Sequence, residues 1–243
     1  MRSLSFLLVA ITLLLHACGS GSHGDDFADI STFLANPSDQ FLVDLEYVDA
    51  GHPFKGLNAN EPHAGAHVHF ENSGNTWPLG GVDIPSNYPP IYAVADGTIN
   101  RVDTYFPVWI NYRYGISLTF ASRNGQQMDF VYSIEPMIDP GDNTFYEPYI
   151  LVTEGQRVNK GDIIGYMYIP PNGGVGTHIH FHLSINGYDS FMAPAIFTQA
   201  IVDGFHARFN GFANDGPDPI PACMGYKLVA EENPFGTGAA DCL

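Results

Sequence analysis

Short runs that alternate apolar and polar residues constrain this chain more than any other feature. Between residues 63 and 187 these runs are separated by Gly, Pro, Asn and Asp. A two-residue alternation is the pattern of a half-buried β-strand, and this stretch has no sustained helical period. We therefore expect a mainly β domain at 41–192, with strands at 41–48, 89–103, 114–122, 127–135, 147–153, 161–169 and 177–185.

Two of the alternating segments carry histidine at every second position. Residues 176–184 read GTHIHFHLS, with His178, His180 and His182, and residues 64–71 read AGAHVHFE, with His67 and His69. On a strand such residues project from one face, while the apolar residues between them enter the core. Neutral imidazole is the commonest metal ligand, so the two clusters favour a metal site. The alternative is two exposed polar strand faces that bind nothing.

The N-terminus has the form of an export signal. Arg2 precedes an apolar run at 4–15, which is too short for a stable membrane span and is typical of a signal peptide. The run ends in Leu-His-Ala-Cys, which resembles a bacterial lipobox and implies a signal peptide at 1–17 and lipidation of Cys18. The alternative is ordinary secretory cleavage with an incidental cysteine. We expect residues 18–40 to be a tether and the protein to be anchored in the cell envelope, on the periplasmic side of any outer membrane.

Composition agrees with an exported globular protein. The formal net charge of −17 disfavours nucleic acid and anionic lipid surfaces as partners, and 45% hydrophobic residues allow a sizeable core. The segment 193–243 is expected to hold a helix at 193–209 and an irregular tail. If Cys18 is lipidated, Cys223 and Cys242 remain, and export permits a disulfide between them that closes a loop of about 20 residues and contributes roughly 3 kcal/mol. Two free thiols are the alternative.

Three segments of the chain resemble the zinc endopeptidase domain of the lysostaphin/LytM type. They are GGVDIPSNYPPIYAVADGTI at 80–99, YGISL at 114–118 and EGQRVNKGDIIGYMYIPPNGGVGTHIHFHLSING at 154–187, the last being the most specific. The resemblance spans roughly residues 64–190. It implies the antiparallel β fold of that family, a bound zinc ion, Asp83 and His180 as zinc ligands, and His178 as a catalytic residue.

The chain departs from the family pattern at two positions of the site. Leu79 stands where the family has its first histidine ligand, and Ile134 stands where it has a second catalytic histidine. An insertion before Asp83 places His69 as the replacement ligand, although His63 and His67 are alternatives. A site of His69, Asp83 and His180 has three protein ligands and one open position, as catalytic zinc does. His178, His182 or His67 would then act as general base or oxyanion partner.

Together these features predict a cell-envelope lipoprotein with a metal-dependent endopeptidase-like domain. The resemblance implies the peptide part of peptidoglycan as its substrate or ligand. The rival hypothesis is a non-catalytic module of the same family, which binds the cell wall or activates a separate cell-wall hydrolase. A metal-buffering protein would explain the histidines but not the family pattern.

Overall fold

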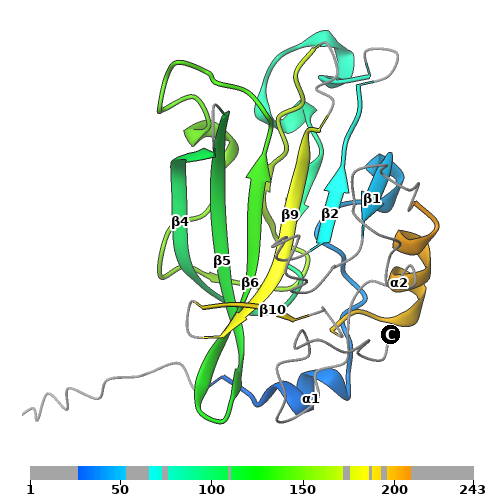
Figure 1. Ribbon diagram of the computed structural model, residues 1–243, viewed down its shortest axis with the longest axis vertical. Helices are drawn as coiled ribbons and strands as arrows, with labels where there is room; N and C mark the ends of the chain where they lie inside the picture. Colours follow the sequence, from blue (N-terminus) through cyan, green and yellow to red (C-terminus); the bar gives the residue numbers. More distant parts are fainter. Residues whose placement is uncertain are drawn as a thin grey trace, which may run out of the picture.

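A computed structural model describes residues 27–52, 66–72, 76–108, 111–171, 176–185, 188–192 and 196–208. The largest element is a sheet with the strand order β1-β2-β9-β6-β5-β4-β7, in which β10 also pairs with β9 (Figure 1). Its strands are β1 (Ala50–His52), β2 (Ala66–His69), β4 (Gly97–Val108), β5 (Asn111–Arg123), β6 (Gln126–Glu135), β7 (Arg157–Val158), β9 (His178–Ile185) and β10 (Tyr188–Met192). A second sheet pairs β3 (Pro90–Tyr92) with β8 (Ile163–Tyr166).

Every strand pairing in the two sheets is antiparallel, so the predicted fold class, mainly antiparallel β, is confirmed. The hairpin between β5 and β6 turns at Asn124 and Gly125, which have φ angles of 51° and 75°. Two successive positive φ angles define the turn that matches strand twist, and Asn-Gly is its preferred sequence. This turn was predictable from two residues alone.

Two predicted strands are wrong. Residues 41–48 contain a 3-10 turn, η1 (Leu45–Tyr47), after Phe41, Leu42 and Val43, which are all buried in succession. A strand with one solvated face does not bury consecutive side chains, so these three residues pack into the core as irregular chain. Residues 147–153 begin with another such turn, η4 (Glu147–Tyr149), with Pro148 in its first turn. Two more turns of this kind are η2 (Leu79–Gly81) and η3 (Pro85–Asn87).

Two short helices flank the sheet (Figure 1). Helix α1 (Ile30–Leu34) packs on β5 through Phe33 and Phe120, whose ring centroids are 5.1 Å apart. Phe33 thus packs α1 against the sheet, and the tether at 18–40 stays a prediction. Helix α2 (Gln199–His206) lies within the predicted 193–209 and buries Ile201, Val202 and Phe205. No helix in the described part of the chain is long and apolar enough to cross a membrane.

The main sheet has one apolar face and one polar face. Ile179, Phe181 and Leu183 of β9 are fully buried in the core, as the alternation predicted. They pack there with Tyr132 and Ile134 of β6 and with aromatic residues of α2 and the N-terminal segment. The alternate residues of β9 carry the histidines. We use the name histidine face for the side of the sheet formed by His67, His69, His178, His180 and His182.

Candidate functional site

Strand pairing brings the two histidine segments of the sequence together. In the antiparallel β2–β9 pair, His67 is opposite His180 and His69 is opposite His178. Residues directly opposite each other in an antiparallel pair share a face and have Cβ atoms about 4.5–5.5 Å apart. Two segments more than 100 residues apart in the chain thus form one cluster of imidazoles.

The imidazole rings of this cluster are in direct contact. His67 Nε2 lies 2.7 Å from His180 Nδ1, and the ring centroids of His67 and His178 are 4.7 Å apart. His69 stacks on His178 with a centroid separation of 4.8 Å and an interplanar angle of 27°. His180 and His182 are also ring neighbours, at 5.6 Å. A nitrogen-to-nitrogen hydrogen bond needs a lone pair on one ring, so at least one of His67 and His180 is neutral.

Burial keeps His69 neutral. Removal from water lowers the pKa of His69 to about 3, and the nearby charge of His178 acts in the same direction. His67 and His182 are buried too, with 3% and 7% of their surface exposed. Neutral imidazole is the form that binds metals, because protonation consumes the lone pair. The donor chemistry of this face therefore suits a transition metal such as zinc.

His178 also contacts a carboxylate that the motif comparison did not indicate. Its Nε2 lies 3.4 Å from Glu135 Oε2, and both side chains are 12% exposed. Its Nδ1 donates a hydrogen bond to the Gly176 carbonyl oxygen. Glu135 accepts a hydrogen bond of 2.9 Å from Ser133 Oγ, to which Arg113 Nη1 donates at 3.4 Å. The ring of His178 is thus held from both nitrogens, which fixes its orientation.

The position of Ile134 explains why Glu135 was missed. Ile134 has no exposed surface and is opposite Ile179 in the β6–β9 pair, on the apolar face. Glu135 is the next residue, so it points to the histidine face and is opposite His178. The second catalytic histidine of the family motif aligns with residue 134, whose side chain lies on the apolar face. The two-residue alternation of strand faces over residues 131–135 would by itself have placed Glu135 on the face opposite to Ile134.

Asp83 contacts tyrosines in the structure. Its Oδ1 accepts hydrogen bonds from Tyr88 Oη at 2.8 Å and from Tyr149 Oη at 3.4 Å. Burial and the carboxylate of Asp83 raise the pKa of both phenols well above its usual value. Leu79, four residues before Asp83, lies in η2 and is 45% exposed.

The predicted ligand set His69, Asp83 and His180 is not assembled in the structure. Among the side chains that the structure describes, no group of three or more His, Cys, Asp or Glu residues is arranged to hold a metal ion. His69 pairs with His178 and His180 pairs with His67, so the histidine beside His180 is His67. Imidazole side chains are suitable metal ligands, but Asp83 is not grouped with them. The assignment of Asp83 as a metal ligand stays a prediction.

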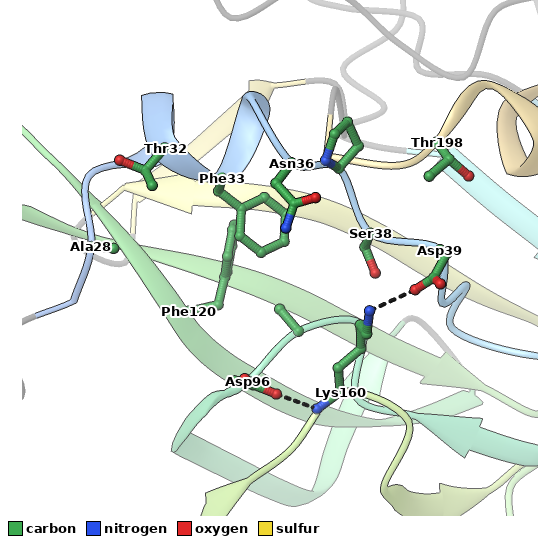
Figure 2. Close-up of a pocket in the computed structure, with 12 residues that line it drawn as sticks. Ala28, Thr32, Phe33, Asn36, Ser38, Asp39, Asp96, Phe120, Lys160 and Thr198 are labelled. Atoms are coloured by element: carbon green, nitrogen blue, oxygen red, sulfur yellow. Dashed lines mark hydrogen bonds and ion pairs between the residues drawn. The ribbon is translucent and has the colours of Figure 1, made fainter.

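A cavity of about 560 Å³ lies between α1 and the loops around Ala95 and Lys160 (Figure 2). Phe33 and Phe120 line it, together with an ion pair of 2.6 Å between Lys160 Nζ and Asp39 Oδ1. Exposed pairs of this kind contribute little to stability. No residue of the histidine face lines the cavity, and Asp83 does not line it either.

Several predicted residues lie outside the described residues. They are Cys18, Cys223, Cys242 and the alternative ligand His63. The predicted lipidation and the predicted disulfide therefore stay predictions.

Comparison with known proteins adds little to these observations. No family model matches the chain, and no curated protein matches it. Among solved structures, one titled "Identification and structural characterization of LytU" is 21% identical, with 57% of this chain and 75% of that chain covered and a TM-score of 0.33. A match at this TM-score carries no argument about the site or its chemistry.

Proposed function

We propose that the chain is a cell-envelope lipoprotein whose β domain is a metal-dependent endopeptidase-like module acting on peptidoglycan peptides. The observation that carries the proposal is the convergence of five histidines from β2 and β9 next to Glu135. The specific motif at 154–187 supports the substrate class, since it resembles a family of peptidoglycan endopeptidases. Lipidation at Cys18 would hold the domain at a membrane beside the cell wall.

The roles of the chain's own residues follow from their contacts. In this proposal His180 and the histidine opposite it would hold zinc, which when bound would polarise a peptide carbonyl and lower the pKa of its water to about 7. His178 would transfer a proton, and its contacts with Gly176 and Glu135 support this role because they orient its ring. His69, which burial keeps neutral, stacks on the ring of His178.

A second candidate function is a non-catalytic module that binds the cell wall or activates a separate hydrolase. Two observations favour it. Asp83 is engaged by Tyr88 and Tyr149, and Ile134 is buried on the apolar face, so two groups of the family site are missing from the histidine face.

Digestion of purified peptidoglycan sacculi by the chain from residue 19 onward, with zinc added, separates the two candidates. We expect release of soluble peptide fragments, and a decrease of about 10²–10⁴-fold for His178→Ala. Lys160→Met is the matched control, because Lys160 lines the separate cavity. Equal digestion by His178→Ala would show that the catalytic residue is wrongly assigned. No digestion by any variant, with stimulation of a separate cell-wall hydrolase by the unmodified protein, would establish the second candidate.

A further inference from the structure

Three tyrosines gather at the carboxylate of Asp83, which lies on an exposed residue. Their rings pack on one another, with centroid separations of 5.7 Å for Tyr88 and Tyr149, 5.2 Å for Tyr88 and Tyr168, and 5.6 Å for Tyr149 and Tyr168. Tyr88 and Tyr149 are only 2% and 6% exposed, so buried rings hold their hydroxyl groups in place. Asp83 is therefore an exposed carboxylate on a rigid aromatic support.

This cluster carries a single negative charge. Burial, followed by the charge of Asp83, raises the pKa of Tyr149 and of Tyr168, and burial with the Asp83 hydrogen bond raises the pKa of Tyr88. The three phenols thus stay protonated at neutral pH. Tyr88 and Tyr149 both donate to Oδ1 of Asp83, and no described residue donates to its Oδ2. The second oxygen is therefore available to a ligand.

Exposed apolar side chains flank the carboxylate along the chain. Leu79, Val82 and Ile84 are 45%, 56% and 46% exposed, and they are three of the six large apolar side chains that are exposed in the described part of the chain. A carboxylate among apolar side chains matches a ligand with a carbon chain and a cationic head, as in the side chain of lysine. The formal net charge of −17 also favours the approach of a cation.

The segment that carries Asp83 leaves the sheet close to the start of β9. Asn72 follows β2, and its Nδ2 donates hydrogen bonds to the carbonyl oxygens of Trp77 at 2.9 Å and of Pro170 at 3.3 Å. In Figure 1 the segment lies beyond the ends of β2 and β9. His178 is the first residue of β9, so Asp83 and the proposed proton-transferring residue are at the same end of the sheet.

We propose that Asp83 and its tyrosines bind the primary ammonium group of a peptide, with the adjoining carbon chain on the exposed apolar side chains of residues 79–84. Asp83 then recognises the peptide, in place of the metal-ligand role that the family motif implies for it. The inference rests on the proposed function for the peptide nature of the ligand, and it names the chemical group that this peptide carries.

Preorganisation distinguishes Asp83 from an ordinary surface carboxylate. An exposed ion pair between two long side chains contributes little, because both side chains must be ordered to form it. Asp83 is already held by Tyr88 at 2.8 Å and by Tyr149 at 3.4 Å, so only the ligand is ordered on binding. Burial of the ligand's carbon chain against apolar side chains adds to the attraction between the charges.

An NMR titration of the chain from residue 19 onward with short peptides, in the presence of a chelator, tests the site. The probe is acetyl-Ala-Lys-Ala-amide, and its matched control carries an acetylated lysine, which keeps the carbon chain and removes the charge. We expect acetylation to weaken binding by about 10–100-fold, the usual effect of losing a hydrogen bond between charged groups. This comparison uses the unmodified protein, so it does not depend on any variant folding.

Two variants locate the binding on the protein. Asp83→Asn keeps the size of the side chain and a hydrogen-bond acceptor for Tyr88, and it should weaken binding of the lysine peptide by about 10–100-fold. Asp142→Asn is the matched control, because Asp142 is an exposed carboxylate whose hydrogen bonds come from Thr144. Its affinity for the lysine peptide should be unchanged.

A third peptide, Gly-Ala-Ala-amide, distinguishes the two sources of a primary ammonium group. Tighter binding of this peptide would assign the site to a peptide N-terminus, tighter binding of the lysine peptide would assign it to a side chain, and either result supports the site. Equal binding of the lysine and acetyl-lysine peptides would overturn the proposal, as would equal losses in Asp83→Asn and Asp142→Asn or no binding of either ammonium peptide.

Zinc separates this proposal from the metal-ligand role of Asp83 and from the hydrolase. Addition of zinc in place of the chelator should leave binding of the lysine peptide unchanged, and loss of binding would return Asp83 to the metal and overturn the proposal. Ammonium-dependent binding by a protein that digests no sacculi would overturn only the hydrolase. Digestion of sacculi by a protein that binds neither ammonium peptide would overturn only the ammonium site.

Discussion

His67 and His180 meet across the β2–β9 pair, with 2.7 Å between Nε2 of the first and Nδ1 of the second. This contact exists because the two residues are directly opposite in register. It makes His67, and not His69, the histidine of β2 that is next to His180.

Stability without metal should rise with pH because of His69. Burial lowers its pKa from 6.5 in the unfolded chain to about 3 in the folded one. Between these values the unfolded state binds more protons, so this contribution is complete above about pH 6.5 and is lost as pH falls toward 3. Urea denaturation with a chelator present, at several pH values, measures it. His69→Gln should have a flatter dependence between pH 3 and 6.5, and an equal slope in both proteins would contradict the assignment.

Glu135→Gln should reduce kcat of sacculus digestion by on the order of 10²-fold and leave KM unchanged. The amide keeps the size of the carboxylate and a bond from Ser133, but it loses the charge that faces His178. Misplacement of a proton-transferring group costs about this much. Glu154→Gln is the matched control, because Glu154 accepts a hydrogen bond from the Val102 backbone. Full activity in Glu135→Gln would show that Glu135 does not position His178.

Ile134→His should not restore the family site. Because Ile134 is fully buried on the apolar face, the new imidazole would enter the core without water. We expect a loss of roughly 2–4 kcal/mol in the free energy of unfolding, against about 0.5–1.5 kcal/mol for Ile134→Val. Chemical denaturation measures both. A stable Ile134→His protein with increased activity would place residue 134 on the histidine face and refute the register of β6.

Gly51→Ala should destabilise the protein by about 1–3 kcal/mol, because a methyl group there overlaps Phe205. The ring of Phe205 is fully buried and has little room to move away. In a Phe205→Leu background the same change should cost less, and a double-mutant cycle measures that coupling. Additive effects would mean that position 51 does not face α2.

Much of the fold was predictable because strand alternation and turn chemistry are local. The histidines of β9 share a face, and Ile179, Phe181 and Leu183 enter the core, as their spacing required. The segment 41–48 was wrongly predicted as a strand, because an apolar run with consecutive buried residues has no period that distinguishes a strand from an irregular core segment.

The sequence by itself determined which residues can lie on one face of a strand, since that follows from the two-residue period of the backbone. Only the tertiary structure decided which histidine is opposite which. Strands β1, β2 and β9 are brought together by pairing between distant segments, and a shift of one residue would have moved every histidine to the apolar face. His67 came to lie opposite His180, and Asp83 became a partner of two tyrosines, because register and packing are properties of the whole chain.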